Sequence, residues 1–212
     1  MNAAIIARIA SGEAGALHEF LLPAPPALAL RGDFDPLDWP DGKPLLAEAA
    51  VLMPIITRAE PSMLFTRRCA HLSRHAGQVS FPGGRAEPQD ASLVETALRE
   101  TQEEIGLDPS FVTIAGFLER HETGTGYAIQ PVVGLVAEGF TLTPDPREVD
   151  AIFEVPLAFL LNPANAQEHR GEFEGRLRRY HSFVYGEHRV WGATAAMLMN
   201  FRERLGMIET PP

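Results

Sequence analysis

Residues Arg99 to Leu107 read Arg-Glu-Thr-Gln-Glu-Glu-Ile-Gly-Leu, and this stretch decides both the fold and the place of its chemistry. Glu100, Glu103 and Glu104 are spaced i, i+3 and i+4, so on a helix their carboxylates share one face. Like charges at these spacings repel, and the only lysine of the chain, Lys43, is far away in sequence. We therefore expect a hard divalent cation, Mg²⁺ or Mn²⁺, to bind these carboxylates. An ordinary solvated helix face is the alternative.

A glycine turn precedes this helix. Val79 to Phe81 is typical of the end of a buried strand, and Pro82-Gly83-Gly84 predicts a turn whose backbone can approach a ligand closely. Asp90 is predicted to cap a helix of about residues 91–105, which Gly106 ends. The Gly84 carbonyl is a candidate further oxygen ligand, and Arg99 is placed to hold one glutamate by a bidentate contact.

Together these segments resemble the signature of the Nudix hydrolases, a glycine, five residues, a glutamate, seven residues and then Arg-Glu-aliphatic-x-Glu-Glu-x-Gly-aliphatic. The residues that match its second half in order are Arg99, Glu100, Glu103, Glu104, Gly106 and Leu107. The first half departs from the pattern, because Asp90 stands in place of the glutamate. Eight residues separate it from Arg99, and Thr101 replaces an aliphatic residue.

An upstream motif resembles that of the coenzyme A pyrophosphatases within this family. Its two parts are Leu64-Phe65-Thr66-Arg67-Arg68 and His75-Ala76-Gly77-Gln78-Val79-Ser80-Phe81-Pro82-Gly83-Gly84. Phe65 replaces a leucine, and Ser73 stands where an arginine is expected, with Arg74 beside it. Further similar segments lie at 125–127, 131–134, 147–149 and 155–157, so the resemblance covers about residues 47–161.

The resemblance implies an α+β fold, a Nudix-type α/β/α sandwich with a mixed β-sheet. It also implies metal-dependent hydrolysis of the diphosphate of coenzyme A or its thioesters, with Mg²⁺ or Mn²⁺ as cofactor. The candidate metal ligands are Gly84, Glu100, Glu103 and Glu104. The candidate catalytic residues are Glu103, Glu104, Arg99 and Glu148, with Glu103 the first choice for the group that activates water and Glu148 the second. The substrate-binding candidates, which suit phosphate oxygens or belong to the upstream motif, are Arg67, Arg68, Arg74, His75 and Gln78.

Two alternative functions stay open from the sequence. The first is an enzyme of the same fold that hydrolyses ADP-ribose or another nucleoside diphosphate derivative. The second is a Nudix module that binds a nucleotide without cleaving it. Such a module is expected to lose glutamates of the signature, and all three are present here.

Composition narrows the classes of partner. The chain has 212 residues, enough for one domain with a sizeable core, and its net charge of −10 argues against nucleic acid. No apolar run reaches the roughly 20 residues that a membrane span needs. The apolar start, Met1 to Ala10, predicts a helix rather than a signal peptide. The single cysteine, Cys69, excludes an intramolecular disulfide and suits a reducing cytoplasm.

Residues 1–46 are expected to form an arm, with one or two short helices over 1–20 and an irregular proline-rich segment from Pro23 to Pro44. This arm is expected to pack on a Nudix domain of residues 47–212. The arm and a hairpin near Tyr180 are the candidate interfaces of a homodimer.

Within the domain, strands are expected at about 47–57, 62–68, 111–119 and 127–137 and within 148–156. Helices are expected at about 157–161 and 192–205, and a hairpin at 175–185 and 189–191. Residues 120–122 are expected to start a plain turn.

Overall fold

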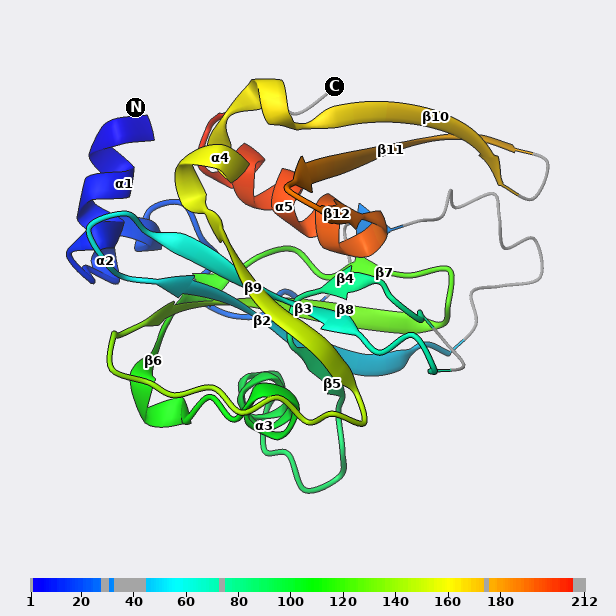
Figure 1. Ribbon diagram of the computed structural model, residues 1–212, viewed down its shortest axis with the longest axis horizontal. Coiled ribbons are helices and arrows are strands. Elements are labelled where there is room, and N and C mark those ends of the chain that lie inside the picture. The colour runs from blue at the N-terminus through cyan, green and yellow to red at the C-terminus, as the bar shows by residue number, and fades with distance from the viewer. Residues whose placement is uncertain (1, 28–30, 33–44, 73–74, 174–175, 208–212) are drawn as a thin grey trace.

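The computed structural model describes residues 2–27, 31–32, 45–72, 75–173 and 176–207 (Figure 1). Within these residues a nine-stranded mixed sheet forms the centre of the molecule, and a three-stranded antiparallel sheet lies beside it. The central sheet contains β1 (Arg31–Gly32), β2 (Ala47–Ile56), β3 (Ser62–Arg68), β4 (Val79–Ser80), β5 (Gly83–Arg85), β6 (Val112–Phe117), β7 (His121–Glu122), β8 (Tyr127–Val136) and β9 (Val149–Pro156).

The central strands β2 and β8 are parallel and pair from Ala47 with Tyr127 to Ile56 with Val136. Both are nearly continuous apolar runs, as expected for strands that are covered on both faces. In β2 the side chain of Leu52 packs in the hydrophobic cluster under one helical layer, while that of Met53 packs in the cluster on the opposite face. Alternation along the strand thus builds two cores, one on each side of the sheet.

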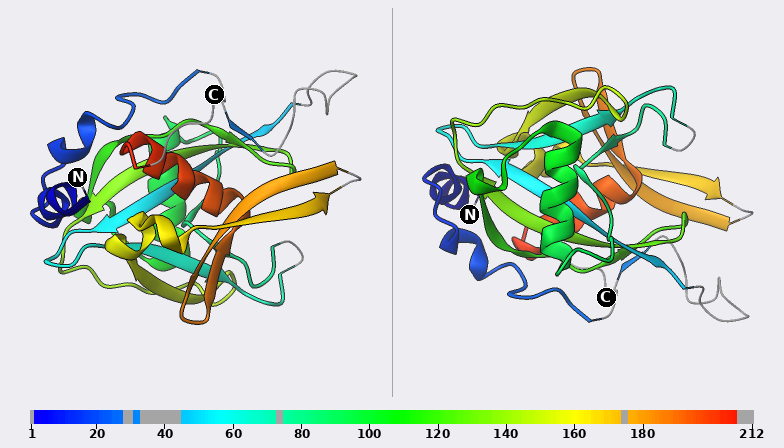
Figure 2. Two further views of the ribbon diagram at one scale, coloured as in Figure 1. Left: turned by 90° about the horizontal axis from the view of Figure 1, so that it is seen from above. Right: turned by 90° about the horizontal axis from the view of Figure 1, so that it is seen from below.

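Helices cover both faces, so the predicted α/β/α sandwich is confirmed. One face carries α3 (Leu93–Ile105), which lies across the sheet in the right-hand view of Figure 2. The opposite face carries α1 (Asn2–Ala10), α2 (Gly15–His18), α4 (Leu157–Leu161) and α5 (Gly192–Arg204). Two short 3₁₀ helices, Pro109–Phe111 and Pro163–Asn165, join these elements.

The helix α3 begins at a different residue from the one predicted. Its N-cap is Ser92, whose hydroxyl accepts a hydrogen bond from the Glu95 amide at 3.2 Å, and Glu95 in turn accepts one from the Ala91 amide at 2.7 Å. This reciprocal arrangement satisfies two amides at the helix start. The prediction that Asp90 caps the helix was therefore wrong. The predicted stop at Gly106 is confirmed, with φ 71° in the left-handed region.

The second sheet contains β10 (Gln167–Phe173), β11 (Arg176–Tyr185) and β12 (His188–Trp191). The predicted hairpin is β11–β12, whereas β10 was not predicted. The prediction of a plain turn over residues 120–122 was wrong for its last two residues, because His121 and Glu122 form β7 and pair with β8. Pairing with β8 on one side and with β1 on the other makes this two-residue segment a strand.

The N-terminal segment joins the core of the domain. The predicted helical start is present as α1 and α2, and Ile9, Leu17 and Leu21 are buried in the same hydrophobic cluster as strands β2 and β3. Of the proline-rich segment, residues 28–30 and 33–44 lie outside the described residues, and Arg31–Gly32 pairs with β7. A division at residue 46 stays a prediction. In the described part of the chain no helix is both long enough and apolar enough to span a membrane.

Candidate metal and active site

Glu100, Glu103 and Glu104, called the acidic face here, lie on α3 where the helix passes the glycine turn. Gly84 lies directly against Glu100, and a Cβ atom added at this position would force the Glu100 carboxylate to shift. Gly83, with φ 147°, would place a Cβ against the backbone of Ala50 and Val51. Two adjacent glycines therefore allow β5 to lie between β2 and the acidic face.

Glu104 is the most buried member of the acidic face, with only 5% of its surface exposed. Its carboxylate accepts a hydrogen bond from the Gly83 amide at 3.2 Å and lies 3.6 Å from Nη1 of Arg68. The pKa of Glu104 is raised to about 8, mainly by burial. The hydrogen bond from Gly83 and the charge of Arg68 oppose this rise, and the negative charges of Glu148 and Glu100 add to it. Burial next to other carboxylates therefore favours the neutral form of this carboxyl group.

Glu100 is half-buried, and burial is also the main cause that raises its pKa. Arg99 opposes this rise, whereas the charges of Glu103 and Glu148 add to it. Nη1 of Arg99 donates to both Glu100, at 2.9 Å, and Glu103, at 3.0 Å. One guanidinium group thus holds two members of the acidic face at once.

The bidentate contact of Arg99 is with Asp90 and not with a glutamate of the acidic face. Nε and Nη2 donate to the two Asp90 oxygens at 2.9 and 3.0 Å, and Nη2 also donates to the Arg85 carbonyl at 3.1 Å. These hydrogen bonds hold the pKa of Asp90 far below its usual range and raise that of Arg99. The Asp90 side chain is 3% exposed and also accepts from the Thr96 hydroxyl at 2.9 Å.

Asp90 is therefore a residue of the site whose role the sequence argument missed. Aspartate is common at helix N-caps, so the capping preference favoured that role over the observed one, which is to hold Arg99. The signal that points to the correct one is its place in the pattern, where the family has a glutamate upstream of the arginine.

The structure brings Glu148 to the acidic face. Its charge raises the pKa values of both Glu100 and Glu104. The segment that carries it is fixed at two points: the Asp145 amide donates to the Glu104 carbonyl at 2.9 Å, and the Glu148 carbonyl accepts from the Cys69 amide at 2.8 Å. Four carboxylates, three from α3 and one from the residue before β9, therefore gather at the end of β3.

Arg67 and Arg68 have different partners, and the register of β3 with β9 shifts between them. Arg68 lies beside Glu104, whereas Nε of Arg67 donates to Asp150 at 2.8 Å and its Nη1 lies 3.6 Å from Glu187. The structure thus brings Arg68 to the acidic face and leaves Arg67 in a separate ion-pair group.

His75 and Gln78 contact each other, with Nδ1 of His75 and Oε1 of Gln78 2.9 Å apart. His75 has φ 55°, a left-handed conformation that is uncommon outside glycine. The Gln78 carbonyl accepts from the Arg68 amide at 2.9 Å, so these two residues lie at the same end of β3 as the acidic face. Arg74, the remaining substrate-binding candidate, lies outside the described residues.

A model of the NUDIX domain family matches residues 47–183. The chain belongs to the Nudix hydrolase family. It is 42% identical over 162 residues to the uncharacterized Nudix hydrolase NudL of Yersinia enterocolitica, a match that covers 75% of this chain and 82% of the relative. The NudL protein of Photorhabdus laumondii is 40% identical over 157 residues, with 74% and 84% covered.

Solved Nudix structures share the fold. The Nudix hydrolase RenU of M. smegmatis aligns with a TM-score of 0.51 over 78% of this chain and 89% of its own, at 19% identity. A MutT/nudix family protein of Enterococcus faecalis aligns with a TM-score of 0.50 over 80% and 68%, at 14% identity. At these identities the likeness shows the fold alone.

The donor set of this Nudix site fits a hard divalent cation. Glu100 and Glu104 are desolvated carboxylates with raised pKa values, and hard cations prefer such oxygen ligands. In the described ranges, however, no three His, Cys, Asp or Glu side chains are placed together as a finished metal site. Arg99 and Arg68 contact the carboxylates instead. A metal that bound these carboxylates would therefore displace one or more of these side chains.

Proposed function

We propose that this protein hydrolyses the diphosphate bond of coenzyme A or its thioesters. The products are 3′,5′-ADP and 4′-phosphopantetheine or its acyl form. The observation that supports metal-dependent diphosphate hydrolysis is the gathering of Glu100, Glu103, Glu104 and Glu148. Burial, and to a lesser extent the neighbouring carboxylates, raises the pKa values of Glu100 and Glu104. A cluster of partly buried carboxylates is suited to a cation and, with that cation, to a diphosphate.

Glu100, Glu103 and Glu104, with the Gly84 carbonyl, would hold the metal. A bound Mg²⁺ or Mn²⁺ supplies charge neutralisation at phosphorus and lowers the pKa of water. Glu103 is 61% exposed in its side chain and is the first choice to orient or deprotonate the attacking water, with Glu148 the second. Arg99, fixed by Asp90, keeps Glu100 and Glu103 in position.

Arg68 is the residue best placed to bind the diphosphate. Its guanidinium group matches phosphate oxygens, and it lies within 3.6 Å of the most buried carboxylate of the site. With Glu104 holding a metal, the guanidinium group of Arg68 would be available to donate to the substrate. Arg67 would bind substrate only after leaving Asp150 and Glu187.

Coenzyme A as the substrate is supported by the upstream motif. Arg68, His75 and Gln78 belong to that motif and lie at one end of β3. This placement suits a loop that contacts the part of the substrate beyond the diphosphate. The assignment of His75, Gln78 and Arg74 to that part is a proposal that rests on the motif.

The experiment is product analysis by chromatography. Purified protein is incubated with coenzyme A, ADP-ribose, NADH and ATP, each with Mg²⁺, with Mn²⁺ and with EDTA. We expect metal-dependent release of 3′,5′-ADP mainly from coenzyme A. Preference for ADP-ribose would contradict the assignment of coenzyme A as the substrate but would agree with the proposed metal site. Binding of these compounds without any product at saturating metal would favour a non-catalytic module.

A further inference from the structure

The hairpin of β10 and β11 extends beyond the body of the protein (Figure 1). β12 pairs with β11 only from Ser182 to Tyr185. The ladder from Glu168 with His181 to Phe173 with Arg176 therefore has two strands and no third within the described residues. Two-stranded ribbons are marginally stable in water, so this one is suited to gain a further strand.

The outer side of β10, called the β10 edge here, is where a further strand fits. Among the described residues β10 pairs only with β11, and no other described segment runs along its outer side in Figure 1. An open edge of seven residues presents backbone amides and carbonyls that a second strand can pair with. The segment contains no proline that would block such pairing.

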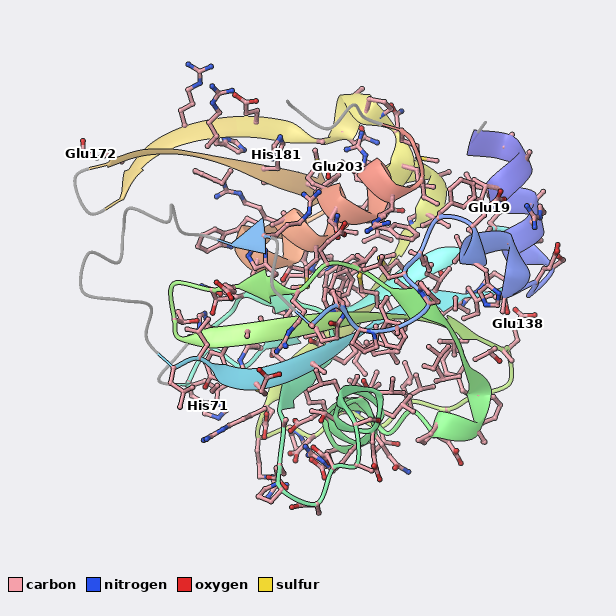
Figure 3. The ribbon with its side chains drawn as sticks, turned by 180° about the vertical axis from the view of Figure 1, so that it is seen from behind. Glu19, His71, Glu138, Glu172, His181 and Glu203 are labelled. Atoms are coloured by element: carbon pink, nitrogen blue, oxygen red, sulfur yellow. The ribbon has the colours of Figure 1, made fainter. Side chains whose placement is uncertain are left out.

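The charges on the β10 edge alternate in sign. Glu168, Arg170 and Glu172 are spaced i and i+2, so they share one face of the strand, and all three are exposed. The side chains of Glu168 and Arg170 are 46% and 62% exposed, and Figure 3 shows Glu172 at the outer end of the hairpin. Two β10 edges with charges of a single sign would repel each other. Two edges with alternating charges can instead pair each charge with an opposite charge of the other copy.

Antiparallel pairing of two β10 strands places opposite charges opposite each other. With the two-fold axis at His169, Arg170 of one copy lies opposite Glu168 of the other. With the axis at Gly171, Arg170 lies opposite Glu172 instead. Each such pair occurs twice because the arrangement is symmetric, and opposite charges in cross-strand pairs are favourable.

We infer that the protein forms a homodimer through the β10 edge. The two three-stranded sheets then join into one sheet across the two-fold axis, and both charge-matched registers depend on Arg170. The partner is a second copy of this chain because the alternation is self-complementary. The inference is independent of the proposed catalytic function.

Two variants test it by complementation. Arg170→Glu makes the edge uniformly negative, and the double variant Glu168→Arg with Glu172→Arg makes it uniformly positive. Sedimentation velocity of the full chain should show the unaltered protein at twice its 23.2 kDa. Each variant alone should sediment as a monomer, and an equimolar mixture should recover the dimer.

The control is Glu138→Arg, which changes an exposed charge in a segment well away from the hairpin (Figure 3) and should leave the dimer intact. Circular dichroism of each variant checks that it is folded. A monomeric unaltered protein, a dimer that survives Arg170→Glu, or a mixture of the two variants that stays monomeric would each overturn the inference.

Discussion

The acidic face of α3 and the β10 edge are built from the same residue types and behave in opposite ways. On β10 the signs alternate and the side chains are solvated, with Glu168 46% exposed. On α3 the carboxylates are neighbours of one sign, and the Glu104 side chain is 6% exposed. Burial next to like charges is what raises the pKa of Glu104 to about 8. The degree of crowding and burial, and not the number of glutamates, therefore distinguishes a candidate metal site from a surface that pairs with protein.

The largest difference between the two regions is expected for turnover in the variant Glu103→Gln. We expect turnover to fall by roughly 10²–10⁴-fold, because the amide cannot accept the proton of the attacking water. Circular dichroism should be unchanged, since the side chain is largely exposed. Glu168→Gln is the matched control on the β10 edge and should retain turnover. Full activity of Glu103→Gln with the same metal requirement would remove Glu103 from the mechanism.

The next effect concerns stability without metal. The folded-state pKa of Glu104, about 8, exceeds its ordinary value of 4.5, so between these values the folded protein keeps a proton that the unfolded chain has released. Relative to Glu104→Gln, the unaltered protein should therefore lose stability as pH rises from about 4.5 to about 8, by roughly 3–5 kcal/mol in total. Urea unfolding in EDTA across this range measures the difference. A difference that does not change with pH would contradict the burial of this charge.

Asp90→Asn should act on the acidic face from a distance. The amide cannot form both charge-assisted hydrogen bonds to Arg99, so Arg99 should hold Glu100 and Glu103 less firmly. We expect metal affinity or turnover to fall about 10–100-fold, as when a residue that orients metal ligands is changed. Asp90→Glu, which restores the residue type of the family pattern, should recover part of the loss. An unchanged metal dependence in Asp90→Asn would leave Asp90 with a purely structural role.

The smallest effect is expected on the β10 edge. Glu168→Gln, studied at high dilution where the monomer prevails, should change the free energy of unfolding by no more than about 0.5 kcal/mol. The reason is that its ion pair with Arg170 is exposed and 3.6 Å long. Equilibrium denaturation provides the measurement. A loss comparable with that of a buried pair would show that this edge is not a solvated surface.

Local patterns predicted most of the elements that position the site. Apolar runs and turn residues gave β2, β3 and β8, and the spacing of the glutamates with Gly106 gave α3. Strand β10 was not predicted because Gln-Glu-His-Arg-Gly-Glu has no apolar alternation, and it becomes a strand only by pairing with β11. Non-local pairing of this kind is not encoded in any short window of sequence.

The candidate site was predictable in its composition but not in its contacts. The residues that gather at the acidic face include Glu148, Arg68 and Gly84, all expected from the motifs. The separation of Arg67 from Arg68 was not expected, because it depends on the register with β9, which shifts between these two residues. The role of Asp90 likewise depends on a loop that returns to α3.

The central claim is that the acidic face needs a cation and the β10 edge does not. Measuring Mn²⁺ binding directly by electron paramagnetic resonance tests this claim. The unaltered protein should bind Mn²⁺, and binding should strengthen as pH rises toward about 8, because Glu104 must release its proton. Replacing Glu100, Glu103 and Glu104 with glutamine should abolish this binding, whereas replacing Glu168 and Glu172 with glutamine should leave it unchanged. Equal Mn²⁺ binding by both variants would contradict the account.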